Sequence, residues 1–242
     1  MNTMFDLSGK WALVTGGRGL AIGMAEGLAK AGANVILMSR STPEAEAFPF
    51  VQADLSSRDS LKKGFDEVLS ITGGRLDILV NCAGIQRRHE IEEFPIEDWD
   101  EVIEVNLTAC FELCQLAGNV MLKQGKGKII NIASMISFFG GMRIPAYAAS
   151  KGGIAQLTKS LAVGWAGKGI QVNAIAPGYM ATDMNTALIE DPVRNASILS
   201  RIPAGRWGTK EDMAGPCVFL ASEASDYVSG AILPVDGAYL VC

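Results

Sequence analysis

Short apolar runs alternate with longer amphipathic segments along nearly the whole chain. The longer segments place apolar residues three and four positions apart, as at Ile22, Ala25 and Leu28, which is typical of helices. We predict strands at Trp11–Thr15, Val35–Ser39, Phe48–Ala53, Ile78–Asn81, Lys128–Ala133, Gln171–Ala176 and Ala231–Val235. Fully apolar strands that alternate with helices indicate a parallel sheet covered on both faces. The pattern therefore predicts an α/β fold with a doubly wound sheet of about seven strands.

The interval between the second and third predicted strands departs from this alternation. Ser41–Ala47 is too short for a crossover helix, so we expect a turn or a single helical turn there. No repeat, low-complexity tract or linker interrupts the chain. We expect residues 1–242 to form a single domain.

Composition and charge narrow the classes of partner. The chain is 49% hydrophobic with a net charge of -5, which disfavours a nucleic-acid or anionic membrane surface. No apolar run approaches the ~18 residues of a membrane span, and Asp6 and Lys10 lie where a signal peptide would be apolar. We expect a cytoplasmic protein that has neither nucleic acid nor membrane as a partner.

The cysteines and the single histidine give no metal-binding pattern. Cys82, Cys110, Cys114, Cys217 and Cys242 include no Cys-x-x-Cys pair. A zinc site would need more cysteines or histidines close together. We expect reduced thiols, no metal site, and a solvated loop position for His89.

A glycine-rich turn runs from Thr15 to Gly23, between the first strand and a helix. Gly16 and Gly19 allow a tight turn and a close approach to a pyrophosphate, which would lie on the N-terminus of the helix. A plain βα turn also favours glycine, but the position after the first strand favours Rossmann-type dinucleotide binding.

The residues after the second and third strands bear on the choice of cofactor. Ser39 and Arg40 stand where an acidic residue would bind the ribose of NAD, so we expect NADP to be favoured over NAD. Arg40 could instead be a solvated loop residue. Asp54 is a candidate partner of the adenine amino group, or the cap of the turn that follows it.

Tyr147 and Lys151 are four residues apart, on one face of a predicted helix. Reduction of a ketone needs a proton donor, and a lysine cation near a tyrosine stabilises its phenolate. Ser134 ends the fifth strand at the carboxyl edge of the sheet, and Asn106 lies in the helical stretch Glu97–Met121. By themselves, the serine could be a cap and the asparagine a structural core residue.

Together these features resemble the short-chain dehydrogenase/reductase family over essentially the whole chain. The motifs are Thr15-Gly16, Asn81-Cys82-Ala83-Gly84, Asn106, Ser134, the Tyr147/Lys151 pair and Pro177-Gly178. The resemblance implies that Tyr147 is the acid–base residue, Lys151 binds the nicotinamide ribose, Ser134 orients the substrate oxygen and Asn106 holds a water. Cofactor-binding residues expected on this basis are Gly16, Arg18, Gly19, Leu20, Ser39, Arg40, Asp54, Leu55, Asn81, Ala83, Gly84, Tyr147, Lys151, Pro177, Gly178, Met180 and Thr182. The resemblance also implies a homotetramer.

Two positions depart from the family pattern. Cys82 replaces the usual second asparagine of its motif. In the glycine-rich turn, Gly19 comes one residue early and Ala21 stands where the last glycine would follow.

Several stretches resemble one subgroup, the bacterial 2-dehydro-3-deoxy-D-gluconate 5-dehydrogenases, also called 2-deoxy-D-gluconate 3-dehydrogenases. They include residues 83–88, 130–135 and 173–183. The resemblance implies a sugar-acid substrate, and gluconate 5-dehydrogenases are near relatives. An acidic protein needs a local cation to bind such an acid, so Arg87, Arg88 and Arg143 are candidates for its carboxylate. Each could instead be a surface arginine or form an intersubunit ion pair.

Two other functions remain open. A 3-oxoacyl-carrier-protein reductase would need a basic patch for an acidic carrier helix, and the C-terminal part of the chain is not evidently basic. A catalytically silent dinucleotide sensor could lose the tyrosine or the lysine, and both are present.

Overall fold

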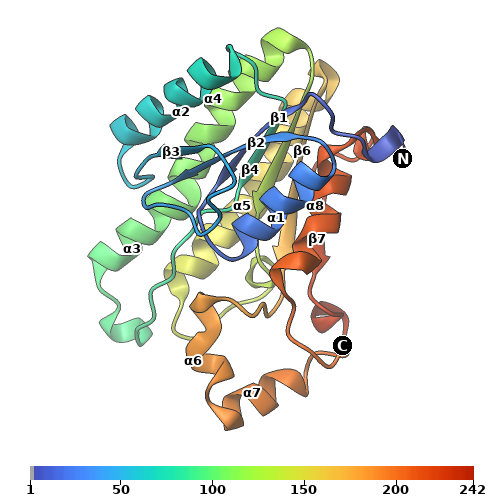
Figure 1. Ribbon diagram of the computed structural model, residues 1–242. Coiled ribbons are helices and arrows are strands. Elements are labelled where there is room, and N and C mark those ends of the chain that lie inside the picture. The colour runs from blue at the N-terminus through green and yellow to red at the C-terminus, as the bar shows by residue number, and fades with distance from the viewer. Residues whose placement is uncertain (1–2) are drawn as a thin grey trace.

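Seven parallel strands form one sheet in the order β3-β2-β1-β4-β5-β6-β7 (Figure 1). The computed structural model describes residues 3–242. The strands are β1 Trp11–Thr15, β2 Asn34–Ser39, β3 Phe50–Gln52, β4 Ile78–Asn81, β5 Gly127–Ile132, β6 Ile170–Pro177 and β7 Ile232–Val235. Every predicted strand is present, and the predicted doubly wound α/β fold is confirmed.

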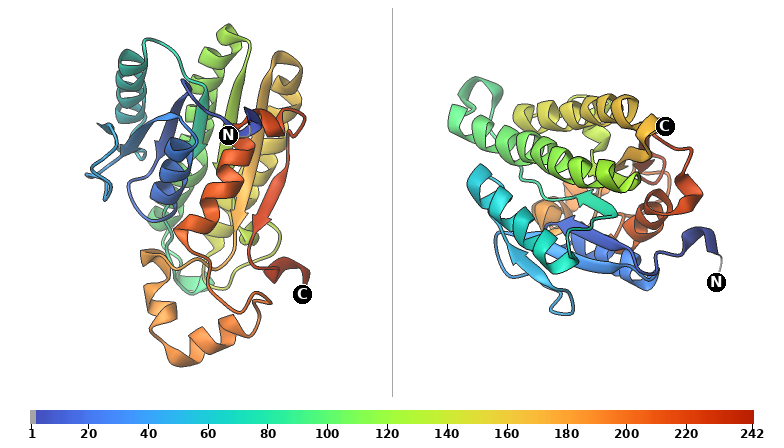
Figure 2. Two further views of the ribbon diagram at one scale, coloured as in Figure 1. Left: turned by 45° about the vertical axis from the view of Figure 1, so that its right-hand side comes forward. Right: turned by 90° about the horizontal axis from the view of Figure 1, so that it is seen from above.

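Helices cover both faces of the sheet (Figure 2). α1 (Leu20–Lys30) and α8 (Ala214–Ala221) lie on one face; α2 (Arg58–Thr72), α4 (Ala109–Gln124) and α5 (Pro145–Trp165) lie on the other. Alternate residues of β1 point to opposite faces, so Leu13 packs with Phe65 of α2 while Val14 packs with Leu28 of α1. The sheet is therefore buried on both faces, as its apolar strands require.

The connection between β2 and β3 contains no helix, as predicted for Ser41–Ala47. The β2–β3 connection packs against the glycine-rich turn. The backbone N–H of Glu44 donates to the carbonyl oxygen of Gly17 at 2.9 Å. A Cβ atom at Gly17 would lie 3.1 Å from Pro43 Cα, so the two segments are in close contact.

One helical run in the described part of the chain, Ile96–Gln124, is long and apolar enough to cross a membrane by length and composition alone. The sequence analysis predicted a helical stretch at Glu97–Met121 but no segment apolar enough to span a membrane. It consists of α3 (Ile96–Ile103), a π-helical turn at Glu104–Thr108 and α4. Leu113, Ala117 and Met121 of α4 are buried against the sheet, which accounts for its apolar character.

The carboxyl ends of β1 and β4 mark the point where the strand order reverses, and ligands of such folds bind there. The β6–α8 connection extends beyond this edge and carries the short helices α6 (Thr186–Ile189) and α7 (Pro192–Leu199). We call residues 179–200 the arm; it projects at the bottom of Figure 1.

Candidate active site

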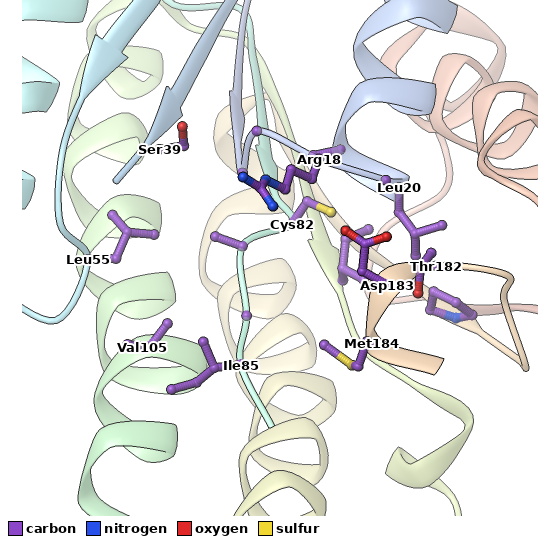
Figure 3. A pocket seen from close by; sticks show the side chains of 18 of the residues that line it. Arg18, Leu20, Ser39, Leu55, Cys82, Ile85, Val105, Thr182, Asp183 and Met184 are labelled. Atoms are coloured by element: carbon purple, nitrogen blue, oxygen red, sulfur yellow. The ribbon is translucent and has the colours of Figure 1, made fainter. Parts of the chain in front are cut away.

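A cleft of about 610 Å³ opens at this edge of the sheet (Figure 3). Of the predicted catalytic residues, Ser134, Tyr147 and Lys151 line it, and Asn106 does not. The predicted cofactor residues that line it are Gly16, Arg18, Gly19, Leu20, Ser39, Arg40, Asp54, Leu55, Ala83, Gly84, Tyr147, Lys151, Pro177, Gly178, Met180 and Thr182. Segments that are far apart in the sequence therefore meet in one cavity.

The glycine-rich turn forms a cradle that side chains would obstruct. Gly16 has φ 104°, and a Cβ atom there would lie 3.1 Å from the Cβ of Ala21. Gly19 has φ 51° and directly precedes α1, which has neither a side-chain cap nor an acidic residue in its first turn. An uncapped helix N-terminus suits an anion such as a pyrophosphate. The shortened turn therefore retains the features that dinucleotide binding needs.

Thr15, the last residue of β1, links this strand to the segment that follows β4, where the strand order reverses. Its Oγ1 accepts hydrogen bonds from the backbone N–H groups of Cys82 at 3.0 Å and Ala83 at 3.1 Å. Burial raises the pKa of the Cys82 thiol to about 12, so the group stays neutral in the cleft. The presence of Cys82 where the family usually has asparagine therefore adds no charge beside the glycine-rich turn.

Two arginines lie at the far end of the cleft, near the ends of β2 and β3. Arg40 has no carboxylate within 4.0 Å among residues 3–242, and Arg18 is 3.9 Å from Glu44 in an exposed pair. Asp54 accepts hydrogen bonds from the backbone N–H and hydroxyl of Ser56, which hold its pKa below the usual value. Asp54 therefore both caps its own turn and lines the cleft.

The N-cap of α2 itself is Ser57, which accepts from the backbone N–H of Ser60 at 3.3 Å. The predicted capping role of Asp54 thus applies to the turn before the helix, not to the helix.

Tyr147 and Lys151 lie on the first two turns of α5, which begins with Pro145. Lys151 is 5% exposed, and its Nζ donates to the carbonyl oxygen of Ile132 at 2.6 Å. Nζ lies 5.7 Å from the centre of the Tyr147 ring. The cation is thus fixed beside the tyrosine by a strand carbonyl.

Ser134 Oγ accepts a hydrogen bond from the backbone N–H of Ile136 at 3.2 Å. No acceptor for its hydroxyl hydrogen is present among residues 3–242, and Ser134 lines the cleft with Tyr147. Its hydrogen is therefore free to donate to a ligand oxygen.

Asn106 is 2% exposed and lies in the π-helical turn, behind the cleft wall. Its Oδ1 accepts from Ile85 N–H at 2.8 Å, and its Nδ2 donates to the Ile85 carbonyl at 2.9 Å and to Ser150 Oγ at 3.2 Å. The side chain joins the loop after β4 to the helix that carries Tyr147. The water-binding role implied by the family resemblance stays a prediction.

Asn81 is the one predicted cofactor residue that does not line the cleft. Its side chain points into the core, where Nδ2 donates to Asn131 Oδ1 at 2.9 Å. Asn131 in turn donates to Thr158 of α5 at 3.0 Å and accepts a bond from Cys110. A direct side-chain contact from Asn81 to the cofactor is thus not supported, because the strand pleat turns this side chain away from the cleft.

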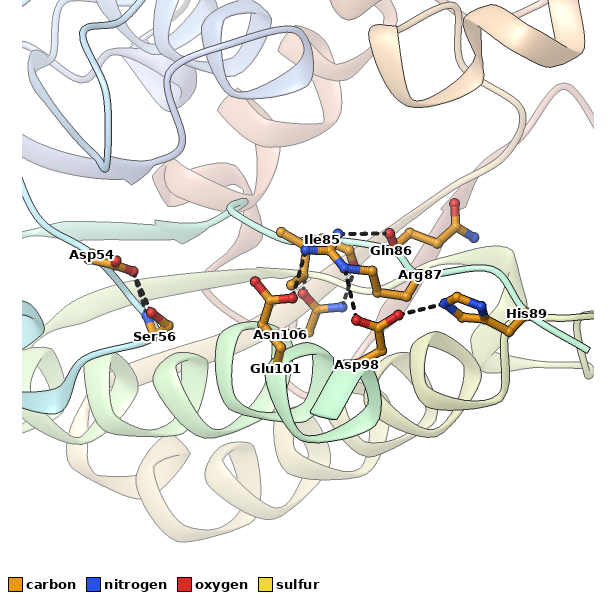
Figure 4. A network of polar contacts seen from close by, with 9 residues as sticks. All are labelled: Asp54, Ser56, Ile85, Gln86, Arg87, His89, Asp98, Glu101 and Asn106. Carbon is orange, nitrogen blue, oxygen red and sulfur yellow. Dashed lines mark hydrogen bonds and ion pairs between the residues drawn. The ribbon is translucent and has the colours of Figure 1, made fainter. Parts of the chain in front are cut away.

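The three candidate substrate arginines have different surroundings, and none lines the cleft. Arg87 is held by Glu101 at 2.6 Å and Asp98 at 3.5 Å (Figure 4), so its charge is already balanced. Arg143 pairs with Glu90 at 3.0 Å. Acidic residues thus already pair with Arg87 and Arg143, and a role of either in binding a substrate carboxylate stays a prediction.

Arg88 differs from these two. Its Nη2 contacts only the Gln86 amide oxygen, at 3.4 Å, and no carboxylate lies within 4.0 Å among residues 3–242. Partial burial lowers its pKa, as do the charges of Arg194 and Arg143.

His89 lies on the loop after β4, and its side chain is 37% exposed, as expected for a solvated loop position. It also has partners within the protein: its Nε2 lies 2.5 Å from Asp98 Oδ2, and its ring packs edge-on against Phe94. Within residues 3–242, no group of three His, Cys, Asp or Glu side chains could hold a metal ion.

The cleft also contains residues that the sequence did not identify. They are Gly17, Ala21, Ser41, Ala53, Cys82, Ile85, Glu101, Val105, Ile132, Ala133, Asp183, Met184 and Asn185. Glu101 and Val105 are one helical turn apart, on the side of the helix that faces the loop after β4.

Comparison with known proteins agrees with this geometry. A family model described as enoyl-(acyl carrier protein) reductase matches residues 14–239. A 2-dehydro-3-deoxy-D-gluconate 5-dehydrogenase of Bacillus subtilis is 49% identical, over 99% of this chain and 98% of the relative.

Solved structures extend the similarity to the fold. An Agrobacterium tumefaciens protein provisionally named 2-deoxy-D-gluconate 3-dehydrogenase, with bound NADP, has 48% identity and a TM-score of 0.92, with 100% of both chains covered. A gluconate 5-dehydrogenase of Burkholderia cenocepacia, in complex with NADP and tartrate, has 39% identity and a TM-score of 0.94, over 99% of this chain and 98% of that one. This chain therefore belongs to the short-chain dehydrogenase/reductase family of NAD(P)-dependent oxidoreductases.

Proposed function

We propose that the protein interconverts a secondary alcohol and a ketone on a sugar acid, with 2-dehydro-3-deoxy-D-gluconate as the first substrate to test. The observation that carries this proposal is the 49% identity to a 2-dehydro-3-deoxy-D-gluconate 5-dehydrogenase over 99% of the chain. The convergence of Ser134, Tyr147 and Lys151 on one cleft supplies the chemistry that the reaction needs.

The residues of the cleft have complementary roles in proton transfer. A bound nicotinamide dinucleotide would accept or supply the hydride. In the reducing direction the Tyr147 hydroxyl gives its proton to the carbonyl oxygen, and in the oxidising direction the phenolate takes it back. Lys151, held by the Ile132 carbonyl, stabilises the phenolate. Ser134 donates its free hydroxyl hydrogen to the same substrate oxygen and orients it.

We further propose that NADP is preferred over NAD. Arg40 lines the cleft without a carboxylate partner among residues 3–242, next to Ser39. Arg18 faces the same end of the cleft and holds Glu44 only weakly. Two cations suit a 2′-phosphate, which an acidic residue at this place would repel. The Ser39 hydroxyl already donates to the Ser41 carbonyl oxygen at 2.5 Å.

The proposal for the substrate carboxylate concerns Arg88 alone among the three candidates. It follows the cleft residue Ile85 by three positions and has no carboxylate to balance its charge. Arginine can bind a carboxylate through two parallel hydrogen bonds.

We also propose that residues 1–242 are one domain, and that the protein is a cytoplasmic homotetramer. Five free cysteines are consistent with a reducing compartment. Phe111 of α4 and Val163 of α5 are 42% and 88% exposed, and burial of such residues would favour association through these helices. Light scattering on the purified protein measures the oligomeric state directly.

The decisive experiment is a substrate panel with both cofactors. The alcohol-bearing sugar acids 2-dehydro-3-deoxy-D-gluconate and gluconate are offered to the purified protein with NAD⁺ and with NADP⁺, and β-ketoacyl thioesters are offered with NADH and with NADPH. We expect turnover of 2-dehydro-3-deoxy-D-gluconate or gluconate, faster with the phosphorylated cofactor. Turnover of the thioesters alone would favour a 3-oxoacyl-carrier-protein reductase, and cofactor binding without any turnover would favour a silent sensor.

A further inference from the structure

Ser137 follows Ser134 by three residues and is not among the residues that line the cleft. It is the last residue of a 3₁₀ turn, Met135–Ser137, whose N-cap is Ser134. The two serines bond to each other in both directions. Ser137 Oγ accepts a hydrogen bond from the backbone N–H of Ser134 at 3.3 Å, and the Ser137 N–H donates to the Ser134 carbonyl oxygen at 2.9 Å. The turn therefore fixes the backbone of Ser134.

The hydroxyl hydrogen of Ser137 bonds to a different element. It is donated to the carbonyl oxygen of Lys151 in α5 at 2.7 Å, 14 residues further along the chain. A capping interaction needs only the acceptor side of this hydroxyl, so the bond to α5 is not required by the turn itself. Because a serine hydroxyl has a single hydrogen, its donation to Lys151 leaves the lone pairs for the Ser134 N–H. Ser137 thus joins the turn that begins at Ser134 to the helix that carries Tyr147.

A second contact from the same lysine completes a ring around Ser134. Lys151 Nζ donates to the Ile132 carbonyl oxygen at 2.6 Å, two residues before Ser134. Lys151 therefore holds this segment on both sides of Ser134, through its side chain at Ile132 and through its backbone at Ser137. Lys151 and Ser134 are 5% and 7% exposed. The loss of a hydrogen-bond partner is costly for groups buried to this extent.

The placement of Ser134 relative to Tyr147 determines whether both hydroxyl groups can reach one substrate oxygen. In the proposed function both bond to that oxygen while the hydride is transferred. Misplacement by ~1 Å in such an arrangement can lower a rate ~10²-fold. The two hydroxyl groups come from different elements, and the Ser137 hydroxyl bonds to both of these elements. Its location is that of a supporting residue behind the reacting groups.

We propose that Ser137 is a positioning residue, which holds Ser134 in place relative to the Tyr147/Lys151 pair. The inference rests on the alcohol–ketone chemistry of the proposed function and not on the identity of the substrate. Without the Ser137 hydroxyl, the Ser134 N–H loses its acceptor and the turn loses its bond to α5. The glycine-rich turn that would bind the cofactor lies on another segment and keeps its contacts.

The first test compares two serine-to-alanine variants in the oxidation of 2-dehydro-3-deoxy-D-gluconate with NADP⁺. We expect Ser137→Ala to lower kcat and kcat/KM alike, roughly tenfold, for the loss of a hydrogen bond that places a reacting group. The dissociation constant of the cofactor should stay unchanged. Ser70→Ala is the matched control and should change none of these values, because the Ser70 hydroxyl also donates to a helix carbonyl, that of Asp66 at 3.0 Å, but on the exposed side of α2.

Rescue tests whether the hydroxyl group itself matters. Ser137→Thr keeps the hydroxyl and should recover most of the kcat that Ser137→Ala loses. Equal losses in the alanine and threonine variants would contradict a role of the hydroxyl.

A double-mutant cycle separates positioning of Ser134 from a general effect on the fold. Ser134→Ala should itself lower kcat by roughly 10²–10³-fold, as for removal of a donor to the reacting oxygen. If Ser137 acts through Ser134, Ser137→Ala should lower kcat no further when it is made in the Ser134→Ala background. If the two losses multiply instead, Ser137 acts on the fold or on α5, and the inference is overturned.

The substrate panel keeps failure of this inference distinct from failure of the proposed function. If the wild type turns over β-ketoacyl thioesters alone, the sugar-acid proposal fails, and the same cycle with a thioester still decides the role of Ser137. If Ser137→Ala keeps the full kcat of an active wild type, the inference fails and the function stands. If the wild type converts no substrate of the panel, the proposed function fails and this inference fails with it.

Discussion

The buried floor of the cleft, around Lys151, and its mouth, which we take as the exposed loop 85–90, differ in how their charged groups are balanced. At the floor, Lys151 is almost fully buried and donates to a strand carbonyl, and Asn106 has partners for both ends of its amide. At the mouth, Arg88 carries a charge that no carboxylate among residues 3–242 balances. The floor is organised before any ligand arrives, whereas the mouth would be completed by the ligand.

Solvent exposure explains the difference. A buried charge or amide without a partner is costly, so the groups of the floor must be satisfied by the protein itself. Arg88 at the mouth is exposed to solvent. Water solvates its guanidinium group, so a cation without a carboxylate partner is tolerated there until an anion binds. In the proposed function, proton transfer therefore belongs to the buried part of the site and substrate selection to its exposed part.

The largest effect is expected at the floor. Tyr147→Phe should lower kcat by roughly 10²–10⁴-fold, because a positioned general acid typically contributes that much. Cofactor affinity and the melting temperature should change little, since the ring and its packing remain. Steady-state kinetics and cofactor titration measure the two quantities. If the variant keeps more than about a tenth of the wild-type kcat, another group donates the proton.

The next effect separates two adjacent residues of the loop. Arg88→Ala should lower kcat/KM for the sugar acid roughly 10- to 150-fold, the loss of a charge-assisted hydrogen bond. Arg87→Ala is the matched control, because Glu101 and Asp98 already hold that guanidinium. It should lower stability by up to ~1 kcal/mol without changing the preference for the acid over its amide. Equal losses in the two variants would contradict the division of roles between them.

A smaller effect is expected at the cofactor end. Arg40→Ala should reduce kcat/KM with NADPH roughly tenfold, as for loss of a bond to a charged group, and leave kcat/KM with NADH nearly unchanged. The dissociation constant of adenosine 2′,5′-bisphosphate, measured by calorimetry, tests the same contact without turnover. Equal or better use of NADH by the wild type would show that Arg40 does not bind a 2′-phosphate.

The smallest effect concerns the chain that returns from the arm to α8. Hydrogen bonds from Arg206 lower the pKa of Asp212 to about 2. A carboxyl with a lowered folded-state pKa stabilises the fold above its usual pKa of 3.8, and this contribution is lost as the pH falls toward 2. Because the pair is partly exposed, Asp212→Asn should cost at most ~1 kcal/mol at pH 7. Urea unfolding should show the difference shrinking between pH 4 and pH 2; a difference that persists at pH 2 would rule out the ion pair as its cause.

Much of the fold and the centre of the site followed from local sequence patterns. The seven strands were predicted because each is a short apolar run that must be buried on both faces. The glycine-rich turn and the Tyr147/Lys151 pair were identified because helix and turn geometry depend on residues a few positions apart.

Only the tertiary structure showed which of the three candidate arginines has no carboxylate partner among residues 3–242. Arg87 and Arg88 are neighbours in sequence, but Arg87 meets two carboxylates of α3, whereas Arg88 has no carboxylate within 4.0 Å among residues 3–242. The direction of the Asn81 side chain, toward Asn131 and away from the cleft, was equally hidden. The charge and hydrogen bonding of a side chain depend on the groups that the fold brings to it, and here those groups come from segments distant in the sequence. The sequence by itself determined the framework and the candidate proton-transfer residues, and the fold determined which of the candidate arginines lack a carboxylate partner.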